Sequence, residues 1–137
     1  MPKLQLTLRK LFLIDALGAA LSAFLLGVVL VHYESIFGIP AQVLYLLAAF
    51  PVVFAIYDLI CYFGVKKNLP GFLIAIALTN LGYCILSITL ASLHYESITL
   101  FGYLYIAGEI AIVVVLAILE IKMAFKSKSS PTPANRA

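Results

Sequence analysis

Residues 32–36 read His-Tyr-Glu-Ser-Ile, and the same five residues recur at 94–98. Each copy follows about twenty apolar residues and precedes another apolar run. At the offset of 62 that aligns the copies, Ser22 falls on Cys84 and Asp58 on Glu120, so small or polar residues recur at matching places. Self-similarity at a fixed offset is typical of tandem duplication. The sequence therefore predicts two helix–loop–helix units, at residues 11–67 and 72–125.

The composition is that of an integral membrane protein. Of the 137 residues, 64% are hydrophobic and 11% are charged, whereas roughly 45–50% apolar is usual in a soluble domain. Four runs have few charges and the length of roughly 20 residues that crosses a bilayer as a helix: residues 11–31, 42–63, 72–92 and 101–121. The expected fold is all-α, a four-transmembrane-helix bundle built from two tandem hairpins. Residues 1–125 form one domain, and 126–137 a disordered basic tail.

The cations predict how the chain is oriented. All nine Lys and Arg residues precede the first run, lie between the second and third, or follow the fourth. By the positive-inside rule, both termini and the loop at 64–71 are expected in the cytoplasm, and both pentapeptides outside. The net charge of +3 is explained by this topology and by attraction to anionic lipids of the bilayer, so no nucleic-acid partner is expected.

The repeated pentapeptide has two interpretations. In the first, His32 and His94 end outward-running helices, where an imidazolium complements the helix dipole, and the following serines help to cap the next helices. In the second, His32, Glu34, His94 and Glu96 meet as an exterior metal site with two nitrogen and two oxygen ligands. The spacing of two residues favours the first, because such residues point about 200° apart around a helix.

Four acidic residues lie inside the predicted spans. Asp15, Asp58 and Glu120 are near the inner boundary, where they could snorkel to water or pair with the cations at that end. Glu109 lies deeper, with no cation at its depth. Because a charge at the bilayer centre costs at least about 2.5–3.5 kcal/mol, Glu109 is expected to be neutral, paired or in contact with water.

Counting the rise along the predicted helices surrounds Glu109 with polar candidates. At 1.5 Å per residue, Ser22 and Cys84 fall near its level, and Asn80 falls about one turn below. Asn80 and Cys84 also share one small, polar stripe of the third run. These four residues are the candidate ligand or proton site. A structural alternative is a protonated Glu109 that bonds Asn80 and ties the fourth span to the third.

Two stretches resemble a set of small uncharacterised bacterial four-helix membrane proteins: Leu11–Val31, and Phe-Ala-Ile-Tyr-Asp at Phe54–Asp58. The resemblance implies a protein of the bacterial inner membrane and assigns no functional residue. The chain is also similar in size and helix number to the small multidrug resistance transporters. It differs from them in lacking Trp and in its one-sided distribution of cations.

Three functions remain open. The chain has no Gly-rich phosphate loop, Gly-x-Ser-x-Gly, His-Glu-x-x-His or Cys-x-x-Cys, so no catalytic residue and no cofactor are identified. The first function is a non-catalytic membrane component, either an accessory subunit of a larger complex or a homo-oligomeric scaffold. Its support is the small-residue face of the first run, Ala19, Ala23 and Gly27. The second is a small proton-linked carrier or ligand-binding transport element that uses Glu109, and the third is the exterior metal site.

Overall fold

The computed structural model describes the backbone of residues 2–129 and the side chains of residues 6–128. Within this range all regular structure is helical. The elements are α1 (Pro2–Phe24), the π-helical turn η1 (Leu25–Val29), α2 (Leu30–His32), α3 (Glu34–Phe37), α4 (Ala41–Gly64), α5 (Leu69–Leu93) and α6 (Leu100–Ser129). Four stretches are long and apolar enough to cross a membrane, at Leu6–His32, Ala41–Gly64, Leu69–Leu93 and Leu100–Lys128. The prediction of an all-α chain with four candidate membrane spans is confirmed.

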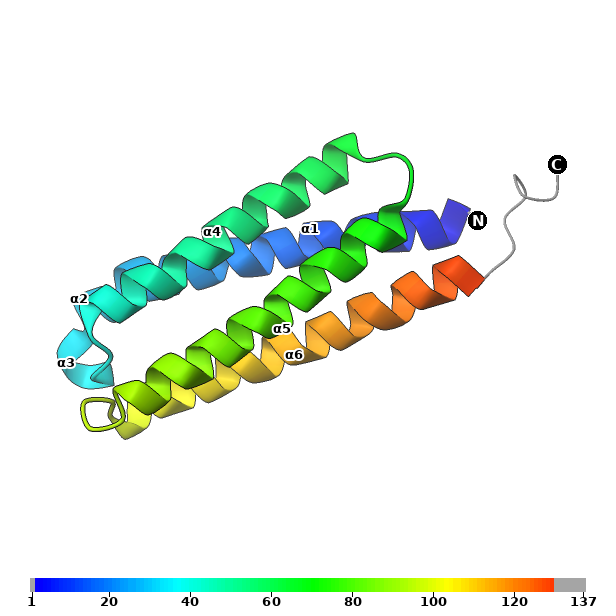
Figure 1. Cartoon of the computed structure of the whole chain (residues 1–137). Helices are drawn as coiled ribbons and strands as arrows, with labels where there is room; N and C mark the ends of the chain where they lie inside the picture. The colour runs from blue at the N-terminus through cyan, green and yellow to red at the C-terminus, as the bar shows by residue number, and fades with distance from the viewer. Residues whose placement is uncertain (1, 130–137) are drawn as a thin grey trace, which may run out of the picture.

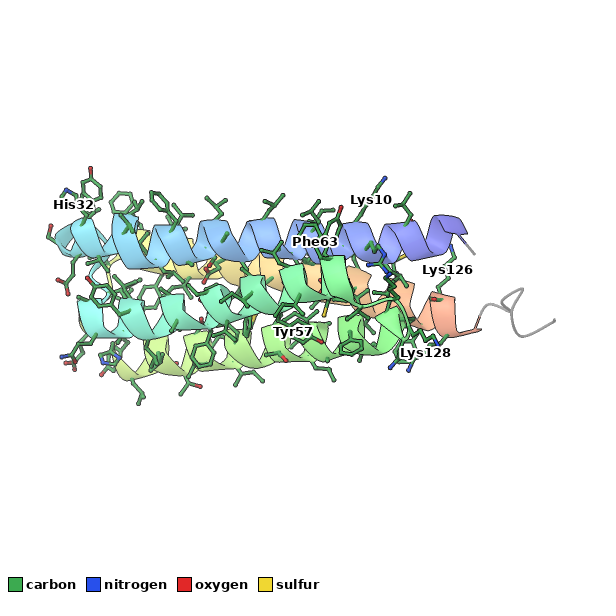
Figure 2. All side chains as sticks on the ribbon, turned by 90° about the horizontal axis from the view of Figure 1, so that it is seen from above. Lys10, His32, Tyr57, Phe63, Lys126 and Lys128 are labelled. Carbon is green, nitrogen blue, oxygen red and sulfur yellow. The ribbon has the colours of Figure 1, made fainter. Side chains whose placement is uncertain are left out.

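The long helices form two antiparallel hairpins (Figure 1). α1, η1 and α2 make one continuous rod that packs along α4, and α5 packs along α6, while contacts between the hairpins are much sparser. The start of α1, the end of α6 and the α4–α5 connection lie at one end of the bundle (Figure 1). Figure 2 shows Lys10, Lys126 and Lys128 toward this end, which we call the lysine end, and His32 at the opposite, histidine end.

Small residues bring α1 and α4 close together. A Cβ atom added at Gly27 would lie 3.3 Å from the Cβ atom of Ala48 on α4. Ala19 packs against the buried core of the bundle. The glycine lies within η1, where one turn of the first rod is π-helical, a feature that was not predicted from the sequence. The small-residue face of the first span therefore serves packing within the chain.

At the histidine end, the connection after the first pentapeptide is docked on the connection after the second. The Thr99 N–H donates to the Phe37 carbonyl at 3.1 Å, and the Thr99 hydroxyl donates to the Ile36 carbonyl at 2.6 Å. The Ser97 hydroxyl donates to the carbonyl of Gly38, which ends α3 in the left-handed conformation with φ of 71°. These bonds join the two hairpins at this end.

The two pentapeptides fold differently beyond a similar break. Tyr33 interrupts the first rod with φ of −107° and ψ of 37°, and His94 ends α5 with φ of −116° and ψ of 26°. The chain then forms the short helix α3 in the first copy and only hydrogen-bonded turns in the second. The duplication of the two hairpins stays a prediction.

At the lysine end, the Arg9 guanidinium closes the first hairpin. It donates to the carbonyl oxygens of Tyr62 at 2.7 Å and Val65 at 2.6 Å, where the last turn of α4 has no helical donors. α6 continues through Ser129, so the first four residues of the predicted tail are helical. A lysine side chain at such a helix end can extend to the membrane–water interface. The helix can therefore continue beyond the apolar run. Residues 130–137 lie outside the described residues.

Candidate functional site

Glu109 is bonded by hydroxyl groups from three helices. Its Oε2 accepts from the Ser22 hydroxyl of α1, and also from the Tyr105 hydroxyl of α6 at 3.3 Å. Its Oε1 accepts from the Tyr83 hydroxyl of α5 at 3.0 Å. A carboxyl group with three hydroxyl donors is well suited to act as a fixed polar anchor inside an apolar bundle.

The other candidates predicted around Glu109 divide between two places. Cys84 is buried and close enough to interact electrostatically with Glu109. Asn80 has a different partner: its amide donates to the two Asp15 carboxyl oxygens at 3.3 and 3.4 Å. Tyr83 was not among the sequence candidates. Its position three residues after Asn80, on the same polar stripe of α5, is the signal that could have found it.

A cavity of about 370 Å³ adjoins the Glu109 carboxyl group, between the two hairpins. Its wall is almost wholly apolar, and the lining residues that carry polar side-chain groups are Asp15, Ser22, Asn80, Tyr83, Tyr105 and Glu109. The lining residues are Asp15, Gly18, Ala19, Leu21, Ser22 and Leu25 of the first rod, Pro51 and Phe54 of α4, Asn80 and Tyr83 of α5, and Leu104, Tyr105, Gly108, Glu109, Ile112, Val113 and Leu116 of α6.

The cavity opens sideways, between α1 and α6. Three apolar residues that border it are largely exposed: Leu21 at 58%, Leu104 at 60% and Ile112 at 71%. Gly18 of α1 and Gly108 of α6 also border the cavity, and a Cβ atom added at either would meet no neighbouring atom within 4 Å. The absence of side chains at these two glycines helps to keep the cavity open.

A second polar group lies closer to the lysine end and receives one residue from each long helix: Asp15 of α1, Asp58 of α4, Asn80 of α5 and Glu120 of α6. We call it the acidic cluster. The three acids are buried, with exposed fractions of 4%, 0% and 0%. The Asp15 carboxyl group accepts from the Asn80 amide and lies close enough to both other carboxyl groups to interact with them electrostatically. Because a carboxylate only accepts hydrogen bonds, two carboxyl groups can bond each other only through a bound proton.

The acidic cluster differs from the expected arrangement of inner-boundary acids. Glu120 and Asp58 were expected to snorkel to water or pair with cations, yet neither is exposed. Arg9, one of the expected partners, is instead bonded to main-chain oxygens of α4. The expectation was based only on the depth of these acids in the membrane. In the structure, the rotation of each helix about its own axis turns the acids toward the interior of the bundle.

The four residues of the metal hypothesis have separate surroundings. The Glu34 carboxyl group accepts from the Ala41 N–H at 2.8 Å and so caps the start of α4. His94 Nδ1 lies 2.9 Å from the Leu90 carbonyl oxygen, and Glu96 accepts from the Tyr95 hydroxyl at 3.3 Å. His32 is exposed at the histidine end. Among residues 6–128, no group of three His, Cys, Asp or Glu side chains has an arrangement that could hold a metal ion.

Comparisons of the chain with protein-family models, with curated proteins and with solved structures found no match.

Proposed function

We propose that the protein is a non-catalytic membrane protein that binds an amphiphilic small molecule within the bilayer, in the cavity beside Glu109. The observation that carries the proposal is the combination of an apolar, sideways-open cavity with a partly buried carboxyl group at its wall. The volume of about 370 Å³ lies at the lower end of the roughly 300–1,000 Å³ of small-molecule sites. A ligand could place its polar head at Glu109 and extend its apolar part between α1 and α6.

The bilayer is the natural source of such a ligand. α1 and α6, which flank the opening, bury only 22% and 17% of the most apolar window of their spans, against 39% in α4 and in α5. An apolar molecule that is dissolved in the hydrocarbon would reach the cavity without crossing water. The few convergent polar groups would select the head group, as in other predominantly apolar sites.

The alternative of a homo-oligomeric scaffold has less support from the part of the small-residue face that packs within the chain. That hypothesis relied on the small-residue face of the first span as a surface for a second copy. In the structure Gly27 packs on Ala48 of the same chain, so this part of the face is already occupied. An accessory role in a larger complex is compatible with the ligand site, because a bound amphiphile could be passed to a partner.

For the orientation, we propose a bacterial inner-membrane protein with the lysine end in the cytoplasm. The support is the gathering of Lys10, Lys126 and Lys128 toward one end of the bundle and the positive-inside rule (Figure 2). The histidine end, with both pentapeptides, would then face outward.

A single tryptophan tests the ligand site, because the natural chain contains none. Leu21→Trp places the reporter at the opening of the cavity, and Ile85→Trp places a control on α5, where the natural side chain is 67% exposed and does not border the cavity. Both proteins would be reconstituted in nanodiscs and titrated with decylamine or decanol carrying a bromine quencher on the chain. Saturable quenching at position 21 alone supports the proposal. Equal, non-saturating quenching at both positions refutes it.

A further inference from the structure

We propose that the acidic cluster of Asp15, Asp58, Asn80 and Glu120 is a proton-binding site, and that its protons exchange for the head of a lipophilic cation in the adjoining cavity. This inference rests on the proposed function and names its ligand class. It turns the site into an exchanger in which a bound cation and bound protons compete for the same carboxyl groups.

The acids inside the candidate spans are separated along the sequence from most of the chain's cations. Four of the six acidic residues lie inside the candidate spans, and no Lys or Arg occurs between Lys10 and Lys66 or between Lys67 and Lys122. A charge that is buried without a partner is costly wherever it lies in the bundle, and the three acids of the acidic cluster are buried. Bound protons or a cationic ligand would neutralise these groups.

The geometry of the acidic cluster indicates protons. Asp58 and Glu120 have 0% exposed surface, and none of their four carboxyl oxygens has a hydrogen-bond donor among the described residues. Both lie close enough to Asp15 for their charges to repel its charge. A bound proton removes one of these charges and also supplies an O–H donor to a neighbouring acceptor, so three adjacent carboxyl groups favour protonation. A metal ion is not favoured there, because no group of three acids among residues 6–128 has a metal-binding arrangement.

Among the described residues, the groups that interact with the acids of the acidic cluster carry no positive charge. Besides Asp15 and Glu120, the Cys61 thiol and the Tyr57 hydroxyl of α4 interact with Asp58, and both are neutral in their ordinary form at pH 7. α5 contributes the Asn80 amide, which carries no charge, and α6 contributes only Glu120 itself. The Arg9 guanidinium of α1 is bonded to main-chain oxygens of α4.

Asp15 links the acidic cluster to the cavity. Its carboxyl group belongs to the cluster and also lines the cavity, as does Asn80, while Glu109 lines the same cavity nearer the histidine end. A cationic head entering the cavity would lie between two acids. It would form an ion pair with a carboxylate as one O–H bond of the cluster breaks and its proton passes to water. One positive charge enters the site and one leaves it, so the charge buried in the membrane is unchanged.

Tetraphenylphosphonium is the test probe, and tetraphenylborate, of the same shape and opposite charge, is its control. The wild-type protein in nanodiscs is expected to bind the phosphonium and not the borate. The dissociation constant should fall about tenfold for each unit of rising pH if one proton is released per bound cation. A pH-indicator dye in weakly buffered solution should record about one proton released per cation. A dissociation constant independent of pH, with no release, would overturn the inference.

Isosteric variants locate the proton. Asp58→Asn with Glu120→Gln keeps the shape of the acidic cluster and should abolish proton release, and Glu120→Gln alone should reduce it. Glu109→Gln should weaken phosphonium binding while the bound fraction still releases protons. Release that is lost in Glu109→Gln and kept in the double variant would assign the proton to Glu109 and refute the cluster. Glu96→Gln, at an exposed acid of the histidine end, is the matched control and should behave as wild type.

Thermal unfolding of the double variant and of the wild type shows whether the variant folds. If it does not fold, the proton release measured on the wild-type protein still tests the inference. Failure of the exchange is also distinct from failure of the ligand site. If the brominated amphiphile still quenches Leu21→Trp saturably while no proton is released, the cavity binds its ligand and only the exchange is wrong.

Discussion

Filling the cavity from Gly108 should remove most of its capacity to bind an amphiphile. In Gly108→Leu the new side chain projects from α6 into space where a Cβ atom meets no neighbouring atom within 4 Å. It occupies the volume of about four ligand carbons, each contributing about 0.8 kcal/mol when buried. The expected loss of binding free energy is about 3 kcal/mol, or on the order of 100-fold in the dissociation constant.

Gly82→Leu is the matched control. Gly82 is also an exposed helical glycine with no atom within 4 Å of an added Cβ, but it does not border the cavity. Both substitutions remove a glycine from a helix interior, which favours folding by up to about 0.8 kcal/mol. Thermal unfolding should therefore show neither variant to be less stable than the parent protein.

The assay is the saturable quenching of the Leu21→Trp reporter, which lies on α1 across the opening from Gly108. The Gly108→Leu protein should require on the order of 100 times more brominated amphiphile for half-saturation, and the Gly82→Leu protein should match its parent. Parental affinity in Gly108→Leu, or an equal loss in Gly82→Leu, would show that the ligand does not occupy this cavity.

Three further predictions concern the frame around the site. Gly102→Ala should destabilise the protein by about 1–3 kcal/mol in thermal unfolding, because its Cβ would collide with the Phe37 carbonyl oxygen, whereas Gly82→Ala should not. Arg9→Gln should lower the free energy of unfolding by about 2 kcal/mol, because it removes the charged donors that bond the carbonyl oxygens at the end of α4. If Arg9→Lys restored the wild-type stability, two donors would not be needed. A cysteine at Ser35, with both natural cysteines replaced, should react with a membrane-impermeant maleimide in intact cells, and protection there with labelling at Ser127 would reverse the proposed orientation.

The helices could be predicted from the sequence because their formation depends on composition and length. An apolar run of about 20 residues must satisfy its own backbone hydrogen bonds in a bilayer, and a helix does so. No knowledge of the neighbouring helices enters this argument. The distribution of the cations could also be predicted without knowing how the helices pack. The cations lie near the chain ends and in the 64–71 loop, and four successive spans bring these segments to one end, so Lys10 and Lys126 were expected there.

The surroundings of Glu109 were predictable only in part. Counting the helical rise brought Ser22 to its level, and the structure joins these two residues by a hydrogen bond. The same count also placed Asn80 within reach, although Asn80 bonds Asp15. Tyr83 was overlooked because the count concerned small and amide side chains. A tyrosine reaches farther from its backbone than these do, and its hydroxyl meets Glu109 from α5.

The acidic cluster could not be derived from depth. Whether Asp58 and Glu120 face water or each other depends on the rotation of α4 and α6 about their axes, and packing against the other helices determines this rotation. The π-helical turn adds a second difficulty, because it changes the angular position of every residue after Leu25 relative to the preceding part of the first rod. Sequence periodicity alone does not reveal such a turn.

The arrangement of packing and polarity explains why the site lies between the hairpins. In a bilayer, apolar side chains gain little by leaving lipid for a neighbouring helix, so close packing and hydrogen bonds hold helices together. Small residues and Arg9 supply both within the first hairpin. Between the hairpins packing is sparse, and the bonds of Glu109 and of the acidic cluster cross this space. If the proposed ligand or a change in protonation alters those bonds, it acts where the bundle has the least packing, and we expect the two hairpins to shift against each other while the contacts within each hairpin persist.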